Sequence, residues 1–361
     1  MSGFIYYIVI FLIFILRLLF NGKKYNKVYL FCCLIVLLSV SSLRGYSVGG
    51  DLYYYLPLFE EISKYSSDQL INTYDKYGVV FKTFFYICSF ITSHPSFFLF
   101  CESCFVLLII FKFIRQTSHN YMLSLFLFVT FGFYTNTFNS IRSSFALCLA
   151  VLGVLYIIKD KRKLAFLMFL IAFEIHKTIA PIFLLLLLKN YHLTLKQITI
   201  AIVTSFAISR LIGISNLVPI ILLYDSNYAM FDDFSGSGYS LLLLDVLMTY
   251  TCFFFSKNSN NKTNEIMLFC LVIASCLQTF APVFNLFTRM AYFFMFYMII
   301  LIPNIITSEF NKKSYRILSV ALITGSLLYF EMIIMTPSPI THTNSQATIP
   351  YYFFWEQKPR L

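Results

Sequence analysis

Apolar segments of membrane-spanning length recur along this chain from residue 4 to residue 334, and they constrain the fold more than any other feature. A helix needs about 20 mostly apolar residues to cross a bilayer, because its backbone groups must be paired within the helix itself. Charged residues make up only 12% of the 361 residues, about half their share in a soluble domain. The pattern excludes a soluble chain, a disordered chain and a soluble enzyme with one membrane anchor. It predicts an all-α, polytopic membrane helix bundle.

Two apolar stretches fit this pattern less well than the others. Residues 79–92 are short for a span and carry Lys82, and residues 164–188 are interrupted near His176 and by Pro181. The remaining candidate spans are residues 4–20, 28–43, 97–114, 121–137, 142–158, 197–213, 240–256, 264–281, 289–306 and 316–334.

Clusters of Lys and Arg between the spans orient the bundle, because cytoplasmic loops are enriched in basic residues. Placing these clusters inside requires residues 79–92 to lie on the outer surface as an interfacial helix. It also requires residues 164–188 to form a helical hairpin with His176 near its tip. A single crossing by 164–188 is the alternative, and it would put the later basic clusters outside. The expected topology has about twelve crossings with both termini outside.

The expected organisation is one transmembrane domain over residues 1–361, with no separate soluble domain and with external loops at 44–96 and 214–239. The first loop is rich in tyrosine, which suits both a membrane-interface belt and stacking against sugar rings, so it decides neither. The net charge of +11 does not indicate nucleic acid, because the basic residues lie in short clusters between apolar runs. We therefore expect no nucleic-acid partner.

Ionisable groups near the outer ends of the spans are the candidate functional residues, because a charge at membrane depth is costly. Arg44 is followed by a glycine-rich loop that includes Gly49 and ends at Asp51. Such a loop can bring backbone N–H groups close to an anion, to which an arginine adds a forked donor. The alternative is an arginine at a helix end that extends its side chain to the interface beside an ordinary turn.

Arg142 and Arg289 also lie where spans begin on the outer side. A cation is not a favourable partner for a helix N-terminus, but an anion shared between an arginine and free backbone N–H groups is. Three arginines converging at the outer ends of helices would suit a doubly charged ligand such as a diphosphate. Each arginine could instead extend to the interface on its own.

His176 lies between Glu174 and Lys177 in the interrupted stretch. Imidazole exchanges protons near neutral pH, and a neighbouring carboxylate can orient the ring or raise its basicity. A hydrogen-bonded histidine with no catalytic part is the alternative.

Four short segments follow one another in a recognisable order. They are Arg44-x3-Val48-Gly49-Gly50-Asp51-x3-Tyr55, Asn139-Ser140-Ile141-Arg142-x3-Ala146, Ala172-Phe173-Glu174-Ile175-His176 and Thr288-Arg289-x2-Tyr292-Phe293. Together they resemble the signature of EpsG-like proteins, which belong with Wzy-type polymerases of O-antigen and capsule repeat units. This sequence departs from the signature at Gly50, Ser143 and Lys177, where Thr, Gln and Ser are usual.

The resemblance implies a membrane glycosyltransferase at the periplasmic face of a bacterial inner membrane. A glycan linked to undecaprenyl diphosphate would be transferred to the next lipid-linked repeat unit, so donor and acceptor both carry a diphosphate and a long lipid. A chain-length regulator is a candidate partner. Arg44, Arg142 and Arg289 would bind the diphosphate and stabilise its developing charge without a metal or another cofactor.

The resemblance and the residue chemistry together suggest a division of roles. His176 would accept the proton of the attacking sugar hydroxyl and Asp51 would position the acceptor, with the reverse assignment as the alternative. Glu174, Tyr55 and Gly49 would support the site. An O-antigen ligase would use the same arginines with a different acceptor. A flippase for lipid-linked oligosaccharides is the alternative from another class, although transporters usually show internal repeats.

Overall fold

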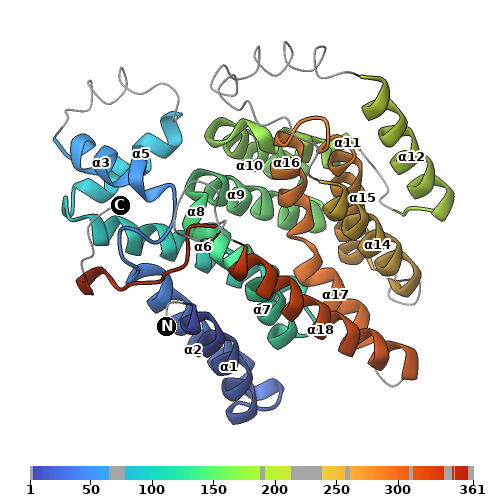
Figure 1. The fold of residues 1–361 in the computed structure, drawn as a ribbon, viewed down its shortest axis with the longest axis horizontal. Coiled ribbons are helices and arrows are strands. Elements are labelled where there is room, and N and C mark those ends of the chain that lie inside the picture. Colours follow the sequence, from blue (N-terminus) through green and yellow to red (C-terminus); the bar gives the residue numbers. More distant parts are fainter. Residues whose placement is uncertain are drawn as a thin grey trace. The chain divides into compact units, whose positions relative to one another are not determined.

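The computed structural model describes residues 3–64, 78–187, 192–212, 238–256, 261–308, 312–336, 344 and 346–356 (Figure 1). The secondary structure of the described residues is helical, apart from an isolated antiparallel β-bridge between Arg44 and Phe353. The chain divides into two compact units. The first comprises residues 1–177 and 310–361, and the second comprises residues 178–309.

The first unit contains most of the predicted site. Its helices are α1 (Phe4–Leu19), α2 (Asn26–Ser42), α3 (Leu52–Ile62), α5 (Val79–Ser89), α6 (Pro95–Thr117), α7 (Tyr121–Thr130), α8 (Phe133–Asn139), α9 (Ile141–Ile158), α10 (Arg162–Ile175) and α18 (Lys313–Met335). Helix α2 packs on α1 and α6, and α6 packs in turn on α9. Helices α7 and α8 are bent by 48° relative to each other.

Helices α9 and α10 form an antiparallel hairpin that positions two of the candidate site segments. A short connection joins them, and the two helices lie side by side along their length (Figure 1). Gly153 on α9 permits this close approach, because a Cβ at that position would overlap the ring of Phe169 on α10. The hairpin therefore brings the beginning of α9 and the end of α10 to the same end of the unit.

The second unit is built around one central helix, α15. Its helices are α11 (Leu184–Leu187), α12 (Leu195–Leu211), α14 (Tyr239–Ser256), α15 (Lys262–Gln278), α16 (Leu286–Met295) and α17 (Met298–Ser308). Helix α15 packs against α12, α14, α16 and α17. Buried polar side chains are paired across these contacts, as between Thr249 and Ser275, whose hydroxyl oxygens are 2.8 Å apart. Pairing of this kind offsets the cost of placing hydroxyl groups at membrane depth.

The helices agree with the expectation of a multi-pass membrane protein. Six of the described helices are long and apolar enough to cross a bilayer, or up to seven if the bent pair of α7 and α8 forms one span. Helix α1 has 16 residues and helices α12 and α15 have 17 each, slightly below the usual length of a span. The all-helical class is thus confirmed, whereas the count of about twelve crossings stays a prediction.

Within residues 79–92, Val79–Ser89 form the 11-residue helix α5, which is too short to cross a bilayer. Its buried residues are Phe81, Lys82, Phe85 and Cys88, which lie on one face. In the sequence, the charge of Lys82 indicates a position at the membrane surface for this helix, but the Lys82 side chain is only 3% exposed. The placement of α5 on the outer membrane surface stays a prediction.

The stretch 164–188 is broken at His176, as expected. Helix α10 ends at Ile175, His176 adopts an extended backbone, and a 3-10 helix over Lys177–Phe183 follows. The second arm belongs to the second compact unit. The break is therefore seen, while the return of the second arm as a hairpin stays a prediction.

The two predicted external loops differ in how much of them is described. Within residues 44–96 the structure contains α3, α5 and the beginning of α6. Most of the second loop, residues 214–237, lies outside the described residues, and residues 238 and 239 lead into α14.

The expected topology has a direct test in reporter fusions. Alkaline phosphatase joined after Tyr77 should be active, because that position is expected outside. The same reporter after Thr117 should be inactive, because one span, α6, separates the two positions. A fusion after Lys24, at an expected cytoplasmic position, serves as the inactive control. Activity at both Tyr77 and Thr117 would show that residues 79–92 cross the membrane.

Candidate functional site

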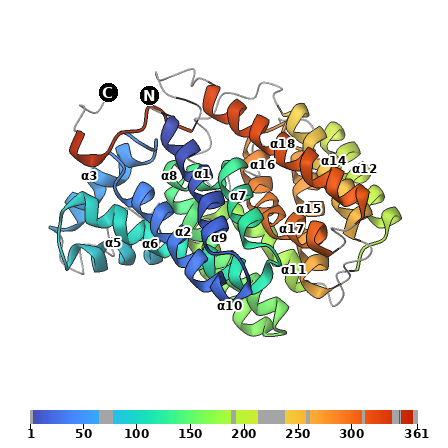
Figure 2. The ribbon, with the colours of Figure 1, turned by 90° about the horizontal axis from the view of Figure 1, so that it is seen from below.

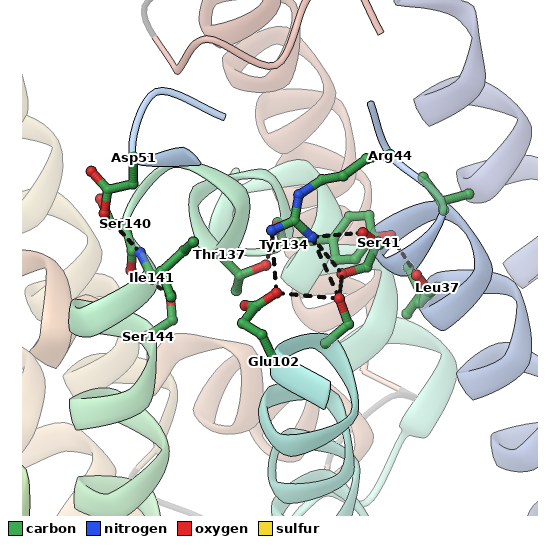
Figure 3. Close-up of polar contacts among 12 residues, drawn as sticks. Leu37, Ser41, Arg44, Asp51, Glu102, Tyr134, Thr137, Ser140, Ile141 and Ser144 are labelled. Atoms are coloured by element: carbon green, nitrogen blue, oxygen red, sulfur yellow. Dashed lines mark hydrogen bonds and ion pairs between the residues drawn. The ribbon is translucent and has the colours of Figure 1, made fainter. Parts of the chain in front are cut away.

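The loop from Arg44 to Asp51 joins α2 to α3 and is docked on the junction between α8 and α9. The Ile141 N–H, at the start of α9, donates to Oδ2 of Asp51 at 3.0 Å. The Gly50 N–H donates to Oδ1 of Asn139 at 2.9 Å. Figure 3 shows the Asp51 carboxylate directed at the first residues of α9. Segments more than 85 residues apart in sequence thus meet at one helix N-terminus, where a carboxylate is favoured.

Gly49 is required by the geometry of this docking. Its φ angle is 111°, a conformation that side chains with a Cβ rarely adopt. A Cβ at this position would also overlap the carbonyl group of Phe138. The Gly49 N–H donates to the carbonyl oxygen of Ala347 at 2.7 Å. The close approach of the loop to the end of α8 therefore requires a glycine at this position, while the supporting role of Gly49 in the site stays a prediction.

Arg44 lies beneath the loop and is fully buried, with 0% of its surface exposed. Its Nη2 donates to Oε2 of Glu102 on α6 at 3.2 Å, and its Nη1 donates to the carbonyl oxygen of Ser41 at 2.6 Å. The guanidinium also lies over the ring of Phe138, 4.7 Å from the ring centroid. Figure 3 shows it directed at Glu102 and Ser41. Among the described residues, its buried Nε has no hydrogen-bond partner.

Glu102 is the principal site residue that sequence reasoning did not assign. Its side chain is 1% exposed, and Ser103 beside it donates to its Oε2 at 3.2 Å. A buried carboxylate is tolerated when it is paired and hydrogen-bonded. The available signal was the position of Glu102 inside an otherwise apolar span, which indicates that a partner must exist without identifying it.

The C-terminal segment, residues 346–356, holds the other side of the loop. Gly45 N–H donates to the carbonyl oxygen of Tyr352 at 2.6 Å, and Phe354 N–H donates to that of Leu43 at 3.0 Å. The segment also passes the beginning of α1, where the Tyr6 hydroxyl donates to the Thr348 carbonyl oxygen (Figure 2).

Tyr351 fastens this segment to the end of α2. Its hydroxyl donates to the carbonyl oxygen of Val40 at 2.7 Å. Burial raises the pKa of the Tyr351 phenol above its ordinary value, so the hydroxyl stays protonated and remains a donor. The loop from Arg44 to Asp51 is therefore fixed by contacts with both α8–α9 and the C-terminal segment.

Arg142 and His176 lie at the same end of the α9–α10 hairpin. Arg142 is the second residue of α9, and His176 follows the last residue of α10. Because the helices are antiparallel and Gly153 faces Phe169, the ends that carry Arg142 and His176 are brought together. Both side chains are half-buried. The structure thus places Arg142, His176 and Asp51 around the N-terminal end of α9.

Glu174 contacts the beginning of α5. The Val79 N–H donates to its Oε1, and the Val80 N–H donates to its Oε2 at 3.3 Å. A carboxylate at a helix N-terminus satisfies unpaired N–H groups and interacts favourably with the helix dipole. Glu174 therefore fixes α5 against the end of α10, a contact that the sequence did not indicate.

Tyr55 connects α5 to the glycine-rich loop. It is one turn beyond Asp51 on α3, and its buried ring packs on Phe81 and Phe85 of α5, with centroids 5.5 and 6.1 Å away. Tyr55 and Glu174 thus both contact α5, Tyr55 from α3 and Glu174 from the end of α10.

Arg289 belongs to the second compact unit. It is an exposed residue near the beginning of α16. The convergence of Arg289 with Arg44 and Arg142 stays a prediction. Within the described ranges there is no group of three or more His, Cys, Asp or Glu side chains arranged to hold a metal ion.

The fold and this site define a polytopic helical membrane protein in which charged and polar side chains gather where α9 begins and α10 ends. A model of the EpsG family matches residues 28–353, and the chain belongs to this family. The match covers the glycine-rich loop, both ends of the α9–α10 hairpin and the C-terminal segment as far as Phe353. Membership indicates a membrane polysaccharide polymerase-like function, related to that of Wzy-type polymerases. Neither a curated protein nor a solved structure matches the chain.

Proposed function

We propose that the protein polymerises undecaprenyl-diphosphate-linked repeat units into a surface polysaccharide, O-antigen or capsule, at the periplasmic face of the inner membrane. The observation that carries the proposal is the docking of Asp51 on the N-terminus of α9, next to Arg142 and to the end of α10 that bears His176. These residue types are those that a glycosyl transfer from a diphosphate needs: a cation, a base and a group that positions a hydroxyl.

In the proposed reaction, a hydroxyl oxygen of the acceptor sugar attacks the anomeric carbon of the donor glycan. The bond between that carbon and the diphosphate oxygen breaks, and the hydroxyl proton passes to Nδ1 or Nε2 of His176. Arg142, at the N-terminal end of α9 where the helix dipole favours an anion, stabilises the negative charge left on the lipid diphosphate. Asp51, held by Ile141, positions the acceptor.

Two roles for Arg44 are compatible with the proposal. Direct contact with the diphosphate would require the guanidinium to leave Glu102, because the side chain is fully buried in this conformation. We therefore favour a positioning role, in which Arg44 supports the loop that carries Asp51. Arg289, on the second unit, is proposed as a further diphosphate-binding residue.

Deletion of the gene should stop chain growth without stopping the supply of repeat units. In a host with lipopolysaccharide, the expected banding pattern is core capped by a single repeat unit, with the long ladder lost. Complete loss of capped core would contradict the proposal and would indicate a ligase or a flippase.

Complementation of the same strain then tests the diphosphate site. Arg142→Lys should lower polymer formation by roughly tenfold or more, because lysine supplies a point charge and not a fork. Arg17→Lys is the matched control, since Arg17 donates to Asn26 at the expected cytoplasmic end of α1. Wild-type ladders from both Arg142→Lys and Arg142→Ala would exclude Arg142 from the site.

A further inference from the structure

Trp355, the one tryptophan of the chain, is held in an unusual position on the C-terminal segment. Its indole is 57% exposed and stacks on the ring of Phe353, with centroids 4.6 Å apart and planes 4° apart. Phe354 contacts it edge-on at 5.0 Å. Although both phenylalanine rings contact the indole, more than half of the surface of Trp355 stays exposed. Among the described residues, the indole N–H has no acceptor.

The backbone beneath the ring is fixed to the candidate site. Phe354 N–H donates to the Leu43 carbonyl oxygen, and Phe353 forms the isolated bridge with Arg44. The turn itself is closed by the Phe353 N–H, which donates to Oε2 of Glu356 at 2.7 Å. The ring is thus preorganised at the beginning of the loop that ends at Asp51. A fixed ring loses little conformational freedom when a ligand covers it.

The surroundings of Trp355 differ from those of aromatic residues that face lipid. Exposed phenylalanines such as Phe11 and Phe31 lie on apolar helices. Trp355 lies instead in a short 3-10 turn (Phe354–Glu356), beside the exposed carboxylate of Glu356. A carboxylate is unfavourable at an anionic membrane surface. A carboxylate accepts hydrogen bonds well from the hydroxyl groups of a sugar. The C–H groups of the sugar ring can pack on an aromatic face.

We propose that Trp355 is a stacking platform for a sugar ring of the acceptor glycan, at the edge of the Arg44–Asp51 loop. The inference rests on the proposed polymerase function and extends it by assigning an acceptor subsite. The exposed surface of the indole packs against the sugar ring, and the indole N–H and the Glu356 carboxylate form hydrogen bonds with its hydroxyl groups.

The single tryptophan makes the test specific, because emission excited selectively from tryptophan reports on this site alone. The full-length protein in detergent micelles is titrated with repeat-unit oligosaccharides released from the host polysaccharide by mild hydrolysis. We expect a saturable change in emission, and none with dextran fragments. In polymerisation assays, Trp355→Ala should raise the acceptor KM by about 5- to 10-fold, and Trp355→Phe should change it less than about twofold.

Tyr25→Ala is the matched control, because Tyr25 is also an exposed aromatic residue. It precedes the first residue of α2, whereas the Arg44–Asp51 loop follows the last. A lipid-anchoring role for Trp355 would be indicated if phosphatidylglycerol vesicles changed the emission of detergent-solubilised protein while the oligosaccharides did not. That result, or an unchanged acceptor KM in Trp355→Ala, overturns the proposal. If the protein binds the oligosaccharides through Trp355 but does not polymerise lipid-linked units, the platform stands and the proposed function fails.

Discussion

His176→Ala should leave single repeat units where the wild-type protein builds long polymer. Loss of a general base typically costs ~10²–10⁴ in rate, and the polymer requires many successive transfers. The measurement is the chain-length distribution in the deletion strain at matched protein levels. His192→Ala is the control, since His192 is 55% exposed and paired with Glu265 in the second unit. That variant should polymerise normally.

Substitutions of Asp51 separate its charge from its contact with α9. In Asp51→Asn the amide oxygen can still accept from the Ile141 N–H, so the docking of the loop is retained and only the negative charge is lost. In Asp51→Ala both are lost, and an unsatisfied N–H remains at the start of α9. If Asp51 positions the acceptor, Asn should raise the acceptor KM, and Ala should in addition lower thermal stability.

The two sets of variants decide between the alternative bases. Long polymer from His176→Ala together with none from Asp51→Asn would reverse the assigned roles. If both variants still polymerise, neither residue is the base, and stabilisation of the leaving diphosphate by arginine must account for the catalysis.

The helices of this protein follow from local sequence because each span must satisfy its own backbone in the membrane. The apolar stretch 142–158 corresponds to α9 (Ile141–Ile158), and the break at His176 follows from the interrupted hydropathy beside Pro181. The number of crossings does not follow in the same way. Helices such as α1, with 16 residues, lie near the limit of spanning length, where composition does not decide.

Contacts between distant segments explain the part of the site that the sequence did not predict. Arg44 and Glu102 are 58 residues apart, and their pairing depends on the packing of α2 on α6. Gly45 meets Tyr352 through the return of the C-terminal segment. A hydropathy pattern identifies apolar faces but not which faces meet. The residue types of the site were therefore recognisable, whereas the partners of Arg44, Asp51 and Glu174 were not.

The buried pair of Arg44 and Glu102 gives the second large expected effect. Glu102→Leu should lower stability by about 3–5 kcal/mol, because it leaves the Arg44 guanidinium buried without its counter-charge. The double variant Arg44→Met/Glu102→Leu should recover much of this loss, since apolar side chains of similar volume often replace a buried ion pair without cost. Thermal unfolding in detergent micelles measures both changes.

Polymer formation by the double variant then assigns the role of Arg44. A stable protein that still polymerises would show that Arg44 only supports the loop, because no guanidinium remains to contact the diphosphate. A stable but inactive protein, with Asp51 still docked on α9, would show that the guanidinium itself is required by the reaction. Ser41 and Ser103, whose hydroxyl groups contact each other in the same cluster, would keep their pairing in either case. If Glu102→Leu were as stable as the wild type, the ion pair would not hold the loop, and the positioning role proposed for Arg44 would be wrong.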